Sequence, residues 1–158
     1  MVDFQVKGDY ALTTEKNVMD VPLIHHYLRH ESYWANGIDY KTVETSIQHS
    51  LCFGLFSYDH ENEEIGAQVG FARVITDYAT FGYLADVFIL KEHRGKGLSK
   101  WLMENVMTHP DLQGLRRLML VTRDAQGLYR QYGFEVYENK DNGLMGIRRK
   151  TEEVYNKS

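Results

Sequence analysis

Cysteine and proline are scarce in this sequence of 158 residues. Cys52 is the only cysteine, and Pro22 and Pro110 are the only prolines. One cysteine can neither close a disulfide within the chain nor build a cysteine-based zinc site. We therefore expect a protein of a reducing compartment, located in the cytoplasm.

The sequence also lacks a long apolar run and an excess of positive charge. No uninterrupted apolar run approaches the roughly 18 residues of a membrane span, and the N-terminus lacks the basic-then-apolar pattern of a signal peptide. The 18 basic and 22 acidic side chains give a net charge of −4, so there is no overall basic field for nucleic acid. We expect neither a membrane nor a nucleic acid as partner, and a bound anion must be held by a local group of residues.

What the sequence does have is the composition of a globular protein. Hydrophobic residues make up 43% of the chain and charged residues 25%, which excludes a disordered or fibrous protein. A domain of this length buries roughly 70% of the surface that its unfolded chain exposes, enough for a core without disulfides. No repeat or low-complexity linker divides the chain, and we expect residues 1–158 to form one domain.

The N-terminal part predicts a short strand followed by two helices. Tyr10–Thr13 has the pattern of a strand. Asp20 is placed to cap a helix that runs through Leu28. Ser32–Ile38 is typical of a loop, and Asp39 is placed to cap a second short helix.

The middle of the chain predicts three strands and then an amphipathic helix. The strands are expected at Leu51–Tyr58, Ile65–Ile75 and Tyr83–Leu90, and their connections are too short for helical crossovers. An antiparallel meander is therefore the simplest arrangement. Apolar residues at helical spacing then predict a helix over Leu98–Met107.

The C-terminal part predicts a strand, a helix and a closing pair of strands. The strand is expected at Arg117–Thr122, and a helix capped by Asp124 is expected to end at Gly133. The closing strands are expected near Phe134–Tyr137 and Leu144–Arg148. The predicted class is α+β, with a mixed, mostly antiparallel sheet flanked by helices.

The loop before the Leu98–Met107 helix carries the strongest chemical signal. The first N–H groups of a helix have no acceptor within it, and together with the helix dipole they form a cradle for phosphate. Gly95 and Gly97 let the backbone approach an anion closely, and Arg94, Lys96 and Lys100 add positive charge. The loop is not a Walker motif, because GKGLSK lacks its spacing. A dinucleotide fingerprint is excluded by Lys100 at the third glycine position and by the expected lack of a parallel βαβ unit.

Two motifs in this sequence resemble those of the GNAT superfamily of acetyl-CoA-dependent N-acyltransferases. The first is the [QR]-x-x-G-x-[GA] pattern, present as Arg94–Ser99, and the second is Y-x-x-x-G-F, present as Tyr129–Phe134 about thirty residues later. The order of predicted elements also agrees along nearly the whole chain. Two positions depart from the usual pattern: Ser99 replaces Gly or Ala, and Lys91 stands where many relatives have proline.

The resemblance implies a co-substrate, acetyl-CoA, and roles for particular residues. Backbone groups of three strand residues would pair with the pantetheine arm, and the amides of six loop residues would hold the pyrophosphate. Tyr129 would protonate the departing thiolate, although spacing alone equally allows a core tyrosine. The strand residues are Val87, Phe88 and Ile89, and the loop residues are Arg94, Gly95, Lys96, Gly97, Leu98 and Ser99.

In this reading an amine attacks the thioester carbonyl, and a backbone N–H near Phe88 or Ile89 stabilises the oxyanion. A primary amine with a pKa of about 10.4 must lose a proton, and Asp86 is the leading candidate for the base, directly or through water. Strict alternation places Asp86 on the same face as Leu84, and a bulge in the strand would change that. A purely structural carboxylate is the alternative. The acceptor pocket is expected near Trp34, Arg73, Asp77 and Tyr83.

The remaining candidates are weaker. His26 and His30 share a helix face but have no evident third ligand, so we expect no metal. Cys52 lies in an apolar strand and is expected to be an inert thiol. The predicted function is transfer of acetyl to a primary amine of a small molecule or peptide, and a homodimer is compatible with it. The alternatives are a non-catalytic acyl-CoA-binding module of the same fold and a nucleotide-binding protein.

Overall fold

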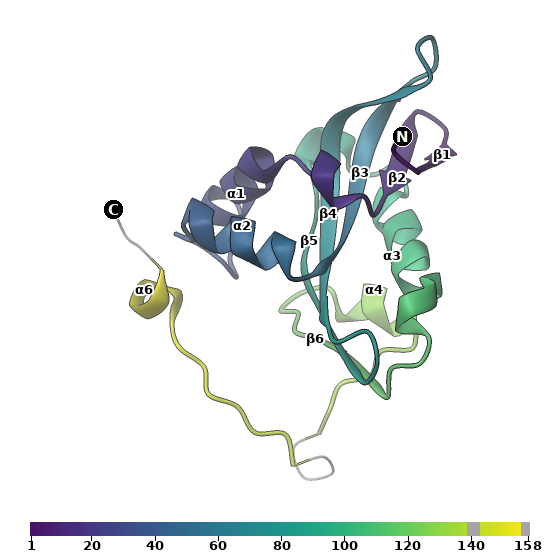
Figure 1. The fold of residues 1–158 in the computed structure, drawn as a ribbon. Coiled ribbons are helices and arrows are strands. Elements are labelled where there is room, and N and C mark those ends of the chain that lie inside the picture. The colour runs from purple at the N-terminus through teal and green to yellow at the C-terminus, as the bar shows by residue number, and fades with distance from the viewer. Residues whose placement is uncertain (139–142, 156–158) are drawn as a thin grey trace.

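The computed structural model describes residues 1–138 and 143–155, and a six-stranded sheet forms its centre (Figure 1). The strands follow one another across the sheet in the order of the sequence, antiparallel from β1 to β5 and parallel between β5 and β6. They are β1 (Gln5–Lys7), β2 (Tyr10–Thr13), β3 (Leu51–Asp59), β4 (Glu64–Thr76), β5 (Phe81–Ile89) and β6 (Arg117–Leu120). The prediction of an α+β fold with a mixed, mostly antiparallel sheet is confirmed.

Two of the helices begin at predicted capping residues. The Asp20 carboxylate accepts from the backbone N–H of Leu23, and the Asp39 carboxylate accepts from that of Thr42. The α-helices are α1 (Val21–His30), α2 (Tyr40–Gln48), α3 (Leu98–Thr108), α4 (Gln126–Arg130) and α6 (Thr151–Val154); short 3-10 turns are η1 (Lys16–Val18), η2 (Lys91–His93) and η3 (Pro110–Leu112). None of the described helices has the length and apolarity to cross a bilayer.

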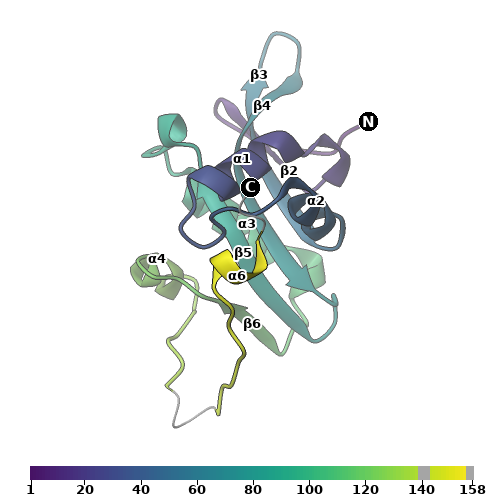
Figure 2. The same ribbon diagram turned by 90° about the vertical axis from the view of Figure 1, so that its left-hand side faces the viewer.

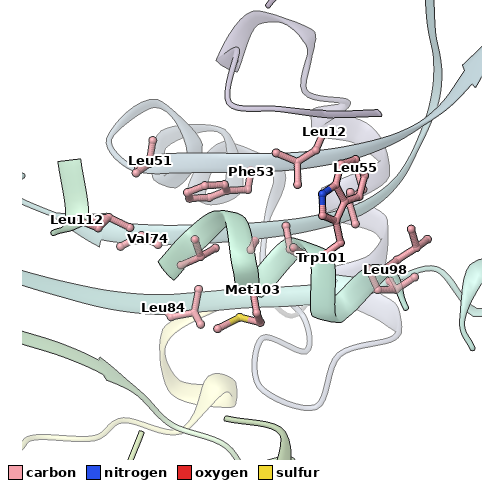
Figure 3. Packing of buried hydrophobic residues seen from close by; sticks show 14 of the residues in the cluster. Leu12, Leu51, Phe53, Leu55, Val74, Leu84, Leu98, Trp101, Met103 and Leu112 are labelled. Carbon is pink, nitrogen blue, oxygen red and sulfur yellow. The ribbon is translucent and has the colours of Figure 1, made fainter. Parts of the chain in front are cut away.

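The helices cover the sheet on its two faces and bury a core on each (Figure 2). On one face, α3 packs through residues that include Leu98, Trp101 and Met103 against apolar side chains of the central strands (Figure 3). On the other face, α1 and α2 enclose Phe71 and Phe88 with their own apolar residues. The sheet is therefore apolar on both faces where helices lie.

A β-bulge in β5 exchanges the two faces of that strand. Phe71 pairs with Phe88 and Arg73 with Ala85, so two residues of β5, Asp86 and Val87, stand opposite one residue of β4. Leu84 consequently lies in the α3 core and Phe88 in the α1–α2 core, although strict alternation would place them on one face. The bulge that the sequence analysis considered is confirmed, and it turns Asp86 away from the Leu84 face.

Only the first half of β5 pairs with β6. The parallel pairing runs from Phe81 opposite Arg117 to Leu84 opposite Leu120 and stops there. From Ala85 onward this edge of β5 has no strand beside it among the described residues. The connection through α3 makes β5–α3–β6 a parallel βαβ unit, so the prediction that such a unit is missing was wrong.

The C-terminal region contains most of the other corrections. Helix α4 begins at Gln126 without a side-chain cap from Asp124; the Thr122 hydroxyl accepts the Ala125 N–H instead. Neither predicted closing strand is formed: the structure gives no strand over residues 134–137 or 144–148. Leu144 and Met145 are adjacent apolar residues, which breaks the alternation that a half-buried strand requires. Strand β1, which pairs with β2 at the sheet edge, was not predicted.

Candidate active site

The loop of residues 94–99, called here the signature loop, presents a row of free backbone donors. Gly95 and Gly97 adopt φ values of 77° and 76°, which place them in the left-handed region that favours glycine. In the described chain, no N–H group from Gly95 to Lys100 donates to a backbone carbonyl, since the first such bond at this end of α3 is from Trp101 to Gly97. This geometry suits a phosphate group held by backbone amides.

The Arg94 side chain anchors the loop to the rest of the fold. Its Nε donates to the Ile89 carbonyl at 2.9 Å, and its Nη2 donates to the Tyr27 hydroxyl at 3.2 Å. Tyr27 in turn stacks on Phe88, with ring centroids 4.0 Å apart. The guanidinium thus joins the end of β5 to α1, a positioning role that the motif alone did not suggest.

The Asp86 carboxylate lies at the centre of a polar group that we call the Asp86 cluster: Trp34, Ser50, Arg73 and Asp86. Its Oδ2 accepts from Arg73 Nε at 2.9 Å, and its Oδ1 accepts from Trp34 Nε1 at 3.0 Å. Arg73 Nη1 also donates to the Ser50 hydroxyl at 3.1 Å. The Arg73 and Asp86 side chains are 13% and 8% exposed, so the pair is largely shielded from water.

The backbone at Asp86 is as unusual as its contacts. Asp86 has a φ of 56° within a strand, a conformation that Asp adopts more readily than most residues. The bulge and this φ together aim the carboxylate at Arg73 and Trp34. Strained backbone of this kind is common at functional sites, where the surrounding structure holds it in place.

The structure places the other two residues predicted for the acceptor pocket, Tyr83 and Asp77, in different surroundings. Tyr83 lies close to the Asp86 cluster, and burial, with a smaller contribution from the Asp86 charge, raises the pKa of its phenol. Asp77 lies instead in the β4–β5 turn, where it accepts bonds from Thr80 and from the N–H groups of Ala79 and Phe81. These bonds lower the pKa of the exposed Asp77 carboxyl, and the structure does not bring it to the cluster.

Tyr129 is buried on α4, with 9% of its surface exposed. Its ring meets Phe134 edge to face at 5.9 Å and belongs to the α3 core. Burial, followed by the nearby Tyr33 and Asp124, raises the pKa of Tyr129 to about 12. The phenol is therefore fully protonated at neutral pH and can act as a hydrogen-bond donor.

A contact missed by the sequence analysis joins the two sides of this region. The Arg123 guanidinium lies over the Tyr33 ring at 3.9 Å from its centroid, and the backbone N–H of Arg123 donates to the Tyr33 hydroxyl at 3.2 Å. Tyr33 also meets the indole of Trp34 edge to face. The loop after α1 is thereby tied to the loop after β6, and Tyr33 lies between the Asp86 cluster and Tyr129. No motif marks either residue, since 90 positions separate them.

The remaining sequence candidates stay apart from this region. The His26 and His30 rings lie 4.9 Å apart, and within residues 1–138 and 143–155 no three potential ligands gather for a metal. Cys52 is fully buried, and burial raises the pKa of its thiol to about 11. A protonated, inaccessible thiol is a poor nucleophile.

Comparison with known proteins identifies the family. A family model described as an acetyltransferase (GNAT) domain matches residues 54–136, more than half of the chain. The chain is also 34% identical to a Gibberella zeae protein, an acetyltransferase by name only, over 89% of this chain and 87% of that one. The chain belongs to the GNAT acetyltransferase family.

Solved structures of GNAT proteins share its fold. A GNAT-family protein of Xanthomonas campestris pv. campestris, an acetyltransferase by name, is 49% identical and superposes with a TM-score of 0.81 over 89% of this chain and 93% of that one. A GNAT-family acetyltransferase from Elizabethkingia anophelis, solved with acetyl-CoA bound, has a TM-score of 0.58 at 15% identity over 92% of both chains. The resemblance stated from the two motifs is confirmed at the level of family and fold.

Proposed function

We infer that this GNAT protein transfers an acetyl group from acetyl-CoA to a primary amine by direct attack of the amine on the thioester. The observation that carries this proposal is the edge of β5 that no other described strand pairs with; this edge leads from Asp86 to the signature loop, whose amides from Gly95 to Ser99 donate to no backbone carbonyl of the described residues. An extended pantetheine arm can add to such an edge as a strand does, through Val87, Phe88 and Ile89. Its pyrophosphate then lies at the amides of residues 94–99.

In this proposal the Asp86 cluster binds the acceptor amine and removes its proton. Each carboxylate oxygen of Asp86 already accepts one bond and can accept another, so the carboxylate can hold an approaching ammonium group. Before it attacks, the ammonium gives up one proton, to Asp86 directly or through water, because only the neutral amine has a lone pair for the thioester carbonyl. As the C–N bond forms, the nitrogen becomes far more acidic and releases a second proton to water. Trp34 and Tyr83 supply aromatic walls beside that position.

In this proposal Tyr129 stabilises the thiolate of CoA as it leaves. A phenol with a pKa of about 12 is a weaker acid than a thiol with a pKa of about 8.5, so complete proton transfer to the thiolate is uphill by roughly 5 kcal/mol. Tyr129 therefore stabilises the departing thiolate by donating a hydrogen bond as the C–S bond breaks, rather than by full protonation. A backbone N–H of the bulged strand near Phe88 or Ile89 stabilises the oxyanion.

The test is an amine panel with detection of free CoA thiol. Metabolite amines, polyamines, amino acids and short peptides are each incubated with acetyl-CoA, and the expected result is saturable thiol release with at least one class. Tight binding of CoA without turnover across the panel would instead favour a non-catalytic acyl-CoA-binding module. Thermal stabilisation by ATP but not by CoA would refute the proposal in favour of a nucleotide-binding protein.

A further inference from the structure

One cavity is lined in part by the signature loop, and a second lies near the η2 turn that precedes it; the two differ in charge. The first, of about 390 Å³, lies between the β1–β2 hairpin and the start of α3. The second, of about 360 Å³, lies between α1 and η2. The charged residues of the first are Lys7, Lys96, Lys100, Asp9 and Glu104, and those of the second are Lys91, Glu31 and Glu92, with His26 beside them.

The lysines of the first cavity are not neutralised by its carboxylates. Among the described residues, none of Lys7, Lys96 and Lys100 forms an ion pair. The Asp9 carboxylate, which is largely exposed, contacts His60 at 3.3 Å. Glu104 is one turn further along α3 than Lys100, away from the loop. Lys96 and Lys100 thus place positive charge at the end of the cavity that adjoins the signature loop, and Lys7 adds a third charge from β1.

Aromatic side chains help to hold two of these ammonium groups. The Lys7 ammonium lies 6.0 Å from the centre of the Trp101 ring, and the Lys96 ammonium lies 5.8 Å from that of Tyr10. Lys96 also donates to the Tyr10 hydroxyl at 3.2 Å, and that hydroxyl bonds to His93 at 2.8 Å. Contacts with uncharged rings leave the positive charges available to an anion.

We propose that the cavity between the β1–β2 hairpin and α3 binds the 3′-phosphate of CoA through Lys7 and Lys100. This inference rests on the proposed function, because the pyrophosphate at residues 94–99 is what brings the rest of the nucleotide to the cavity. Lys96, Gly97 and Leu98 belong both to the loop and to the cavity lining, so the two binding surfaces are continuous. A phosphate monoester carries close to two negative charges at pH 7, which suits several ammonium groups better than one.

The second cavity is lined by more acidic than basic side chains. Glu31 and Glu92 outnumber its one lysine, and a phosphate there would face two carboxylates. Lys91 is therefore a matched control: it lies next to the same loop, carries the same charge and is exposed, but lines the other cavity.

The experiment compares CoA with 3′-dephospho-CoA by isothermal titration calorimetry. The wild-type protein is expected to bind CoA about tenfold more tightly, and Lys7→Gln combined with Lys100→Gln should reduce that ratio below about threefold. The affinity of the double variant for 3′-dephospho-CoA should fall by much less than its affinity for CoA, and an unchanged midpoint of thermal unfolding shows that the fold is intact. Lys91→Gln should keep the full ratio.

Equal binding of the two ligands by the wild-type protein would overturn this inference and leave the proposed function standing. The inference is also overturned if Lys91→Gln, and not the double variant, abolishes the preference. Failure of the wild-type protein to bind either ligand would remove the proposed function and this inference together. A preference that persists in the double variant assigns the 3′-phosphate to other residues and also refutes the proposal.

Discussion

The signature loop and the Asp86 cluster are built in opposite ways. The loop is one contiguous stretch whose useful groups are backbone amides, and its shape depends on two glycines with positive φ. The cluster takes side chains from four separate segments, and hydrogen bonds between Trp34, Arg73 and Asp86 hold it together. The signature loop can be recognised in a linear motif, whereas the Asp86 cluster exists only in the folded chain.

This difference predicts how each region tolerates substitution. Any residue other than proline supplies an amide N–H, so the loop should tolerate changes that keep its backbone conformation. The Asp86 cluster should not tolerate substitution of its ion-paired residues, because removing one member of a shielded ion pair leaves the other charge without its partner. The predictions below test this contrast, from the largest expected effect to the smallest.

Asp86→Asn should have the largest effect. Asparagine tolerates the left-handed φ of this position, but it can neither take a proton from the amine nor balance the Arg73 charge. We expect kcat to fall by about 10²- to 10⁴-fold and the free energy of unfolding to fall by about 3 kcal/mol. Thiol-release kinetics and urea unfolding measure the two effects.

The matched control for that variant is Asp77→Asn, which removes a carboxylate from the β4–β5 turn. It should leave kcat/KM within about twofold of the wild type, because Asp77 binds only turn groups. A large loss of activity in the control would show that Asp77 takes part in binding the acceptor. Normal activity of Asp86→Asn would make Asp86 a structural carboxylate.

Tyr129→Phe should slow the reaction by about 10- to 100-fold. The variant loses a hydrogen bond to a developing anion, which is worth about 1.5–3 kcal/mol, and keeps the ring that packs against Phe134. The KM for acetyl-CoA should change little, because the phosphates are held elsewhere. A kcat equal to that of the wild type would show that Tyr129 only fills the core.

The same phenol should make the protein sensitive to alkali. The unfolded chain releases the tyrosine proton near pH 10, whereas the folded chain holds it to about pH 12. Because the folded state binds this proton more tightly, the unfolded chain is progressively favoured as the pH rises from about 10 to about 12. Urea unfolding at several pH values should show a smaller alkaline loss for Tyr129→Phe than for the wild type. Parallel curves would contradict the assignment of that loss to Tyr129.

Gly97→Ala tests the backbone of the signature loop. A Cβ added at this position would meet no atom within 4 Å, so the cost is conformational strain at a φ of 76°, about 1–2 kcal/mol. We expect the dissociation constant of CoA to rise by about tenfold as the amides change direction. Gly114→Ala, at a glycine with equally open space and no positive φ, is the control and should bind CoA normally.

Ser99→Gly should have the smallest effect. If position 99 supplies only an amide and requires only a small residue, CoA affinity should stay within about twofold of the wild type. Calorimetric titration with CoA measures it. A tenfold loss, about 1.4 kcal/mol, would mean that the serine hydroxyl itself binds phosphate, which would break the contrast between the two regions.

Local patterns predicted most elements of the first 108 residues. The caps at Asp20 and Asp39, the loop between the first two helices and strands β2 to β5 all follow from short-range sequence signals. The closing strands were predicted wrongly, since apolar residues in an extended segment do not reveal whether a sheet edge is available to them. Strand β1 was missed because three exposed residues carry no apolar alternation.

The sequence by itself determined the family, the signature loop and the position of Tyr129, because each rests on residues close together in the chain. Only the tertiary structure decided which way Asp86 faces, since a bulge of one residue reverses the alternation of β5. It also decided that Trp34, Ser50 and Arg73 surround that carboxylate and that Tyr33 meets Arg123. Such contacts join segments 13 to 90 positions apart, and no local propensity encodes them.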